Sequence, residues 1–359
     1  MPLWLVVLAG CSLADPGPTG PTREALLESL ATRVFVPAYA ELETASATLA
    51  AEAEGLCPDP SAKLAGVRSA WLDARVPLKR AEAWAFGPIV DLRIDSAIDF
   101  WPVRTDAVEE AIASGEEPTP QWVEAQGTAT KGLPVLEYLL FDPTTDEAAI
   151  VASLDPATPE GAHRCALGSA LASRVAVRAA ELHDAWDPAG GDFAGRLRAD
   201  GDDSPGNPSL RMAVNDVVNH TVFALQNITD MKLGRPLGDK SGGTPQPDAV
   251  ESRFSDNARV DIIANLEGVE QVYLGGGGLG LADVVGPLDA ELDTAIRTQI
   301  DASKVAIVGL PDPLRLAVTD DPARVRAAQD VVRELRRLFE VDVAGLLGIN
   351  ITLNDNDGD

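Results

Sequence analysis

The spacing of apolar residues along the chain predicts a protein built almost wholly from α-helices. Apolar positions recur every three or four residues between breaks rich in Pro and Gly, which is the period of a helix with one buried face. The long predicted helices cover residues 22–54, 61–86, 159–186, 209–233, 250–274, 287–308 and 322–340, and shorter ones cover residues 89–100, 105–114, 119–130 and 134–141. Pro37 is expected to kink the first helix and Ser61 to cap the second.

Strand signals are few by comparison. Only residues 348–353 alternate between apolar and other side chains in the way a short strand does. Two consecutive sets of long helices favour an all-α fold with two helical-bundle-like halves packed side by side. The division we predict is an N-terminal helical domain over residues 22–144 and a C-terminal helical-bundle domain over residues 145–359.

One apolar run contains a carboxylate that needs a partner. Residues 131–141 are mostly apolar, and at helical spacing Glu137 shares one side with Pro134, Tyr138 and Phe141. A carboxylate among such neighbours is expected to be at least partly buried. Burial of that kind is costly unless the group is paired, hydrogen-bonded or protonated. Glu137 is therefore the best single indicator of a functional site.

The first residues are typical of an exported lipoprotein. An apolar run ends in Leu8-Ala9-Gly10-Cys11, which is similar to a bacterial lipobox in which the Cys carries the lipid. No Lys or Arg precedes the run, and a short buried segment is the alternative interpretation. Residues 1–21 are thus predicted to be a lipoprotein signal and tether, with a membrane partner reached through Cys11. Ser12 after the Cys favours the outer membrane, facing the periplasm.

With Cys11 lipidated, two cysteines remain. Cys57 and Cys165 form a disulfide if the protein is exported to an oxidising compartment, or else they are two separate buried thiols. The sequence leaves both alternatives open, because it does not supply the distance between them.

The charge excludes some functions. The formal net charge is −27 and the pI is about 4.4, which argues against nucleic acid as a partner. The charge fits either a soluble acidic protein or one that attracts cations. The chain has three histidines, none of them in a His-Glu-x-x-His pattern, and it has no phosphate loop.

Several motifs together resemble one family. Gly132-Leu133-Pro134-Val135-Leu136-Glu137, followed by Tyr138-Leu139-Leu140-Phe141, is similar to the Gly-x-His-x-x-Glu motif of imelysin-like proteins, with Pro134 in place of the His. Further similar segments occur in order in both halves: 70–75, 86–88, 93–95, 100–102, 230–238, 251–255, 261–268 and 273–275. The family comprises exported bacterial proteins, described as peptidases or as iron-regulated envelope proteins, with two related helical halves.

The resemblance implies a site between those halves. In the family the motif Glu lies at a cleft there, which implies that Glu137 meets Arg253, Ser255 or Arg93. The other candidate cleft residues are Pro134, Asp95, Trp101 and Glu251. Ser255 is also a candidate helix cap. The alternative is a buried ion-pair network that only holds the two halves together.

Three functions follow from these patterns. The first is a lipid-anchored, non-catalytic envelope protein that binds a ligand at the cleft, either a metal ion such as iron or a small molecule, in a role linked to iron or other metal uptake. Envelope uptake proteins would then be its partners. The second is a metallopeptidase of the imelysin type. Pro134 argues against it, because a catalytic metal needs about three protein ligands and proline supplies none. The third is a structural scaffold of the envelope.

Overall fold

The computed structural model describes residues 20–204 and 206–352, and it confirms the all-α prediction. No strand occurs among these residues, whose single β-type pairing is an isolated bridge between Ser204 and Asn207. Residues 348–352 therefore do not form the predicted strand, and the backbone N–H of Thr352 donates to Asn219 Oδ1 on a helix instead, at 2.8 Å. Within the described ranges, no helix has the length and apolar character that a membrane crossing requires. Cys11 and residues 354–359 lie outside the described residues.

The helices follow one another with short connections. The N-terminal part of the chain forms α1 (Arg23–Leu30), η1 (Ala31–Phe35), α2 (Val36–Glu54), α3 (Pro60–Ala81), η2 (Glu82–Trp84), α4 (Pro88–Asp91), α5 (Ile94–Ile98), α6 (Thr105–Ala113), α7 (Pro120–Ala125), η3 (Thr128–Thr130), α8 (Leu133–Leu140), α9 (Glu147–Ser153) and α10 (Pro159–Trp186). The remainder forms α11 (Phe193–Leu197), α12 (Leu210–Gln226), η4 (Asn227–Gly234), η5 (Pro247–Ala249), α13 (Ala258–Leu274), η6 (Gly275–Gly277), α14 (Ala282–Leu288), α15 (Ala290–Val308), α16 (Leu314–Asp320), α17 (Pro322–Arg337), η7 (Leu338–Val343) and α18 (Ala344–Leu347).

Two local predictions were wrong, and the kink at Pro37 stays a prediction: Pro37 is the second residue of α2, after the π-helical turn η1. Asp59, rather than Ser61, caps α3: its carboxylate accepts from the backbone N–H of Ala62 at 3.0 Å, and Pro60 takes the first helical position. The helix predicted from residue 250 begins only at residue 258, because residues 250–257 form turns with a positive φ at Ser252.

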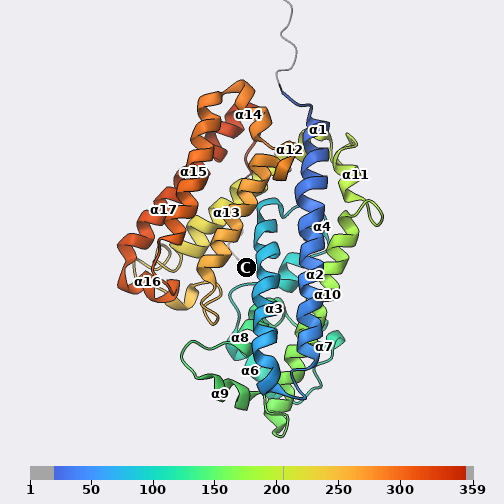
Figure 1. Cartoon of the computed structure of the whole chain (residues 1–359), viewed down its shortest axis with the longest axis vertical. Coiled ribbons are helices and arrows are strands. Elements are labelled where there is room, and N and C mark those ends of the chain that lie inside the picture. The colour runs from blue at the N-terminus through green and yellow to red at the C-terminus, as the bar shows by residue number, and fades with distance from the viewer. Residues whose placement is uncertain (1–19, 205, 353–359) are drawn as a thin grey trace, which may run out of the picture.

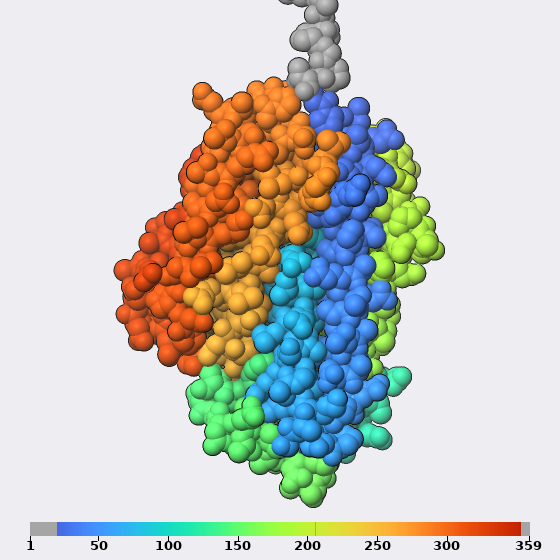
Figure 2. Space-filling view, in the orientation of Figure 1, coloured from blue at the N-terminus to red at the C-terminus, as the bar shows by residue number. Residues whose placement is uncertain are grey.

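The long helices lie side by side in a continuous series. α10 packs along α2, α2 along α3, α3 along α13, α13 along α15 and α15 along α17 (Figure 1). In the space-filling view, the gold and orange surface lies against the blue and cyan surface of the N-terminal helices, and the red surface lies farther out (Figure 2). The domain boundary between residues 144 and 145 stays a prediction, and α10, which follows it in sequence, packs on α2. We refer to α1–α10 and α11–α18 as the two sets of helices, and the contact between α3 and α13 is one of those that join them.

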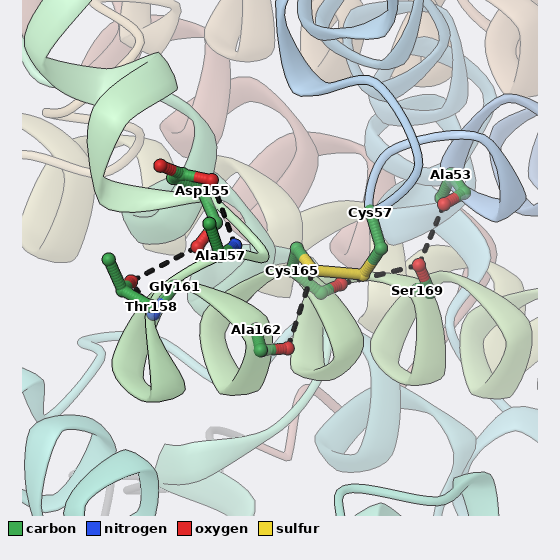
Figure 3. The surroundings of a disulfide bond; sticks show 9 residues. All are labelled: Ala53, Cys57, Asp155, Ala157, Thr158, Gly161, Ala162, Cys165 and Ser169. Carbon is green, nitrogen blue, oxygen red and sulfur yellow. Dashed lines mark hydrogen bonds between the residues drawn. A yellow bond between two sulfur atoms is a disulfide. The ribbon is translucent and has the colours of Figure 1, made fainter.

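A disulfide joins two neighbouring helical segments. Cys57, just after α2, is bonded to Cys165 of α10, with a Cα–Cα distance of 5.1 Å and a sequence separation of 108 residues (Figure 3). Beside it, the hydroxyl of Ser169 donates to the backbone carbonyl of Ala53 at 2.7 Å. The bond therefore fixes the end of α2 on α10, with the whole of α3–α9 inside the covalent loop.

Loss of this bond is expected to destabilise the fold. Exchanging both cysteines for Ser should lower the free energy of unfolding by about 4 kcal/mol, because the unfolded chain regains the freedom of a long loop. Urea unfolding of the oxidised protein and the double variant measures the difference. A reducing agent should weaken the oxidised protein and leave the double variant unchanged. Equal stability of the oxidised native protein and the double variant would contradict the prediction.

Candidate functional site

Glu137 lies buried in α8 and is held by the turns that precede α13. Glu137 is only 3% exposed, so its carboxylate depends on polar groups of the protein rather than on water. Oε1 accepts three hydrogen bonds, from the backbone N–H of Phe254 at 3.0 Å, from that of Ser255 at 2.8 Å and from the Ser255 hydroxyl at 2.7 Å. Oε2 accepts none from the residues that the structure describes. Oε1 is thus held by three hydrogen bonds, while Oε2 remains without one from the described residues.

Burial dominates the titration of this carboxyl. It raises the pKa of Glu137 to about 7, against the opposing effects of the Ser255 backbone and hydroxyl donors and of the Arg75 charge. Near neutral pH the group is therefore divided between its protonated and ionised forms. A second charge or ligand close to Oε2 can shift that balance.

Glu137 lines a small cavity of about 20 Å³. A space of that size holds about one water molecule or one ion, and it is too small for an organic ligand. Apolar and aromatic side chains form much of its wall, and its polar groups come mainly from the segment before α13. The lining residues are Trp101, Pro102, Val103, Pro134, Glu137, Asp248, Val250, Ser252, Arg253 and Phe254.

The start of α8 is fixed by a close backbone contact. Gly132 has φ +84°, and a Cβ there would lie 2.6 Å from the carbonyl oxygen of Ile98, so only glycine fits. The indole N–H of Trp71 in α3 donates to the carbonyl of Leu133 at 3.0 Å. Pro134 occupies the first turn of α8, where the missing N–H costs no helical hydrogen bond. These contacts direct Glu137 toward the segment before α13.

A buried network of charges lies beside the cavity and joins the two sets of helices. Arg75 of α3 is 1% exposed and donates to Asp261 Oδ2 of α13 at 2.6 Å and to Glu251 Oε1 at 3.3 Å. It also pairs with Asp99, which follows α5. The Ser252 hydroxyl, 2.6 Å from Asp261 Oδ2, connects this network to the cavity wall.

Lys79, one turn after Arg75, extends the network. Burial and the charge of Arg75 both act to lower the pKa of Lys79, but the carboxylates of Asp99, Glu251 and Glu82 outweigh them and hold it well above its usual value. Burial likewise acts to raise the pKa of Glu251, yet the neighbouring cations keep it well below its usual range. These groups are therefore charged in the folded protein.

Close helix packing makes this network possible. A Cβ at Gly268 of α13 would lie 2.1 Å from the carbonyl oxygen of Arg80, so glycine allows α13 to approach α3. The amide of Asn265 then donates to the Lys79 carbonyl at 2.7 Å and accepts from Lys232 Nζ at 2.7 Å. A larger residue at position 268 would separate the charges that the network pairs.

The structure brings some of the sequence-predicted residues together and separates others. Ser255 binds Glu137 rather than capping α13, whose N-cap residue is Asn257. Arg253 shares the cavity with Glu137, although its own ion pair is with Asp248 at 2.6 Å. Of the other predicted residues, Pro134 and Trp101 line the cavity and Glu251 belongs to the charge network. Arg93 and Asp95 are exposed at the start of α5, where Arg93 is the N-cap and Asp95 lies in the first turn.

Sequence reasoning did not assign Arg75, Lys79, Lys232 or Asp261 to the site. Each of them has at least one partner more than 100 residues away, and no local spacing reveals such a pair. One available signal was the position of Arg75 and Lys79 on α3, where apolar residues such as Trp71 and Leu78 predict a buried face. Two cations at adjacent turns of a buried face require carboxylates from elsewhere.

The chain is similar in sequence or in fold to proteins of known description. The chain is 27% identical over 333 residues to the iron-regulated protein A of Synechococcus elongatus, covering 89% of this chain and 86% of that protein. A crystal structure from Parabacteroides distasonis, described as an iron-regulated protein A precursor, matches with a TM-score of 0.78 at 20% identity, over 93% of this chain and 96% of that one. An imelysin-like protein from Psychrobacter arcticum matches with a TM-score of 0.74 at 18% identity, over 92% and 97% of the two chains.

The family model covers most of the chain. Residues 35–340 match the model described as imelysin, peptidase M75, and this range contains both Glu137 and the whole buried charge network. The two structural likenesses, at this level of identity, concern the fold alone. On the extent of the match to the family model, the chain belongs to the imelysin family.

Proposed function

We propose that this protein is an exported, lipid-anchored binding protein that takes a metal ion, iron first of all, at the cavity of Glu137 between the two sets of helices. The observation that carries the proposal is the half-used carboxylate: Oε1 of Glu137 accepts hydrogen bonds from Ser255 and Phe254, while Oε2 accepts none from the described residues, and Glu137 lines a cavity of about 20 Å³. Carboxylate oxygens are the ligands that hard cations prefer, and the volume suits one ion.

The charge around the cavity supports a cation as the ligand. In the adjoining network, four carboxylates (Glu82, Asp99, Glu251 and Asp261) meet three cations (Arg75, Lys79 and Lys232). One negative charge is left uncompensated, and ionised Glu137 adds another. The net charge of −27 on the whole chain also favours cation capture. The name of the Synechococcus relative, iron-regulated protein A, makes iron the first ion to test.

The setting we propose is the bacterial cell envelope. Lipid attachment at Cys11, an outer-membrane position facing the periplasm and envelope uptake proteins as partners rest on the sequence, since Cys11 lies outside the described residues. A Cys57–Cys165 disulfide is in keeping with an oxidising compartment.

Catalysis is the less favoured function for a specific reason. A water-activating metal needs about three protein ligands and an open position. Pro134 supplies no ligand in the slot where the family motif has a His, and the Ser252 hydroxyl of the cavity wall is already 2.6 Å from Asp261. We therefore propose binding without hydrolysis.

Metal titration of the purified protein tests this function. We expect one equivalent of Fe²⁺, added without oxygen, to bind and raise the melting temperature, and we expect Glu137→Gln to abolish that binding. Because the metal displaces the proton of Glu137, whose pKa is about 7, affinity should rise by about tenfold between pH 6 and pH 8. Isothermal titration at both pH values measures this. Glu147→Gln, which removes an exposed carboxylate, is the matched control and should bind as the native protein does.

Three other outcomes would replace the proposal. Equal iron binding in Glu137→Gln would place the metal elsewhere. Metal-dependent cleavage of unfolded substrates, lost in Glu137→Gln, would establish a peptidase. No binding of Fe²⁺, Fe³⁺, Mn²⁺ or Zn²⁺, with a change in stability as the only effect of Glu137→Gln, would establish a structural scaffold.

A further inference from the structure

A second cavity, of about 210 Å³, lies beside α12, and none of its lining residues belongs to the Glu137 cavity. Its wall comes from α4, α11, α12 and the loop before α12. Cavities for drug-sized molecules have volumes of about 300 Å³ or more, so this one suits a compound of roughly ten non-hydrogen atoms. We refer to it as the α12 cavity, and the side chains that decide its chemistry are Phe86, Asp91, Phe193, Asp203, Met212 and Asp216.

The carboxylate of Asp216 lines the α12 cavity without a partner. Asp216 is partly buried, and none of the described residues donates a hydrogen bond to its carboxylate or forms an ion pair with it. Burial and the negative charge of Asp203 raise the pKa of Asp216 to about 6. A carboxylate that has lost part of its water without gaining a donor carries a free-energy cost, which a cation in the cavity would offset. Asp216 differs in this respect from the carboxylates of the buried network, whose cations come from the protein itself.

The charge in the wall of the α12 cavity is all negative. Asp91 and Asp203 line it together with Asp216, and no Lys or Arg is among the described residues of the wall. The single Arg of α12, Arg211, is exposed and does not line the cavity. His220, one turn after Asp216, is neutral near pH 7 because burial lowers its pKa to about 4. A positively charged ligand is therefore the kind that this wall favours.

The rest of the wall favours an organic cation over a metal ion. Phe86 and Phe193 are buried and Met212 is partly buried, and together they offer apolar surface that a bare ion would not use. Arg196 lies over the Phe193 ring, 5.4 Å from its centroid, but it is exposed and does not line the cavity. Among the described residues, the three aspartates do not form a group with oxygens within 4.8 Å of one another, so they do not converge on one ion.

The loop that forms one side of the α12 cavity is held by its own hydrogen bonds. Asp203 Oδ1 accepts from the backbone N–H of Ser209 at 2.7 Å. Asp202 Oδ1 accepts from the backbone N–H of Ser204 at 3.1 Å and from the Asn207 amide at 2.9 Å. The wall is thus formed before a ligand arrives, which lowers the entropic cost of binding.

We propose that the α12 cavity binds a small organic ammonium compound. Its charged head lies against Asp216, and its hydrocarbon part packs on Phe86, Phe193 and Met212. This gives the protein a ligand site of a different chemical class from a metal site. The inference does not depend on metal binding at Glu137.

Hexylamine, which is an ammonium ion at pH 8, is the probe that tests this site. Isothermal titration in the presence of a metal chelator compares it with 1-hexanol and hexanoate, which have the same chain without the positive charge. We expect one hexylammonium ion to bind per chain, and we expect 1-hexanol and hexanoate to bind at least tenfold more weakly. Asp216→Asn should weaken hexylamine binding at least tenfold, because it removes a charge-assisted contact. Asp320→Asn removes an exposed carboxylate and should leave the affinity unchanged.

A second variant tests the cavity itself. Met212→Trp fills part of the space while retaining Asp216, and it should also weaken hexylamine binding at least tenfold. Asp216→Asn removes an unpaired charge, so we expect it to fold and to melt no lower than the native protein; if it does not fold, Met212→Trp decides. Equal affinity for hexylamine and 1-hexanol would show that no ammonium group is recognised. Affinity that survives both variants, or that falls equally in Asp320→Asn, would place the ligand elsewhere, and no binding of hexylamine at millimolar concentration would overturn the inference.

Discussion

Arg75→Met is expected to lower the free energy of unfolding by about 4 kcal/mol, because it removes one member of a buried charge network and leaves the others unpaired. Arg75 is 1% exposed and donates to Asp261 and Glu251 while also pairing with Asp99. Methionine fills much of the same volume, so the loss reports the charge rather than an empty space. Urea unfolding of both proteins gives the difference.

Two control variants distinguish the loss of a buried charge from the loss of an exposed one. Arg104→Met removes an exposed Arg whose partner Asp106 is also exposed, and it should leave stability unchanged within error. Adding Asp261→Asn to Arg75→Met should recover part of the loss, because the amide needs no counter-charge. A loss below about 1 kcal/mol for Arg75→Met would contradict the account of the network as a tightly paired interface.

Glu137→Gln is expected to stabilise the protein at high pH and to have little effect at low pH. The pKa of Glu137 is raised to about 7 in the folded protein, from 4.5. Below pH 4.5 both folded and unfolded chains carry the proton. As the pH rises toward 7, the unfolded chain loses its proton first, so the native protein loses stability. Above pH 7 the penalty is complete, at about 3 kcal/mol, and Gln never incurs it.

The pH dependence distinguishes this effect from simple repacking. The difference in unfolding free energy between Glu137→Gln and the native protein should grow by about 2 kcal/mol or more between pH 5 and pH 8.5. Chemical denaturation at the two pH values, without added metal, measures it. The Glu147→Gln control should show the same difference at both. If the difference in unfolding free energy between Glu137→Gln and the native protein is the same at both pH values, the carboxylate is ionised over the whole range from pH 5 to pH 8.5.

The fold could be predicted from the sequence because helix signals are local. α10 (Pro159–Trp186) has the predicted bounds, since Thr158 caps it, Pro159 begins it and Asp187 follows it in an extended conformation. The segment 250–257 could not be predicted in the same way. Its turns are held by Glu137, which lies more than 100 residues away, and no local pattern contains that contact.

The candidate site was predictable only in part for the same reason. The apolar neighbours of Glu137 predict its burial, and the family resemblance pointed to Ser255, which does bind it. Arg93 fails because an arginine beside aromatic residues suits an exposed segment equally well. Lys79 was missed because its three carboxylates come from residues 82, 99 and 251, and two of them are distant in sequence.

The Cys57–Cys165 bond also determines what a broken backbone would do. Arg75 and Glu137 both lie within the 108-residue separation that the bond closes, and residues 143–149 form an exposed segment in the same stretch. A protease that cuts there leaves the two fragments in one covalent molecule, with α3 and α8 tethered to the rest. The nicked protein can come apart only after reduction, so cleavage of that exposed segment does not by itself release the helices that carry the site.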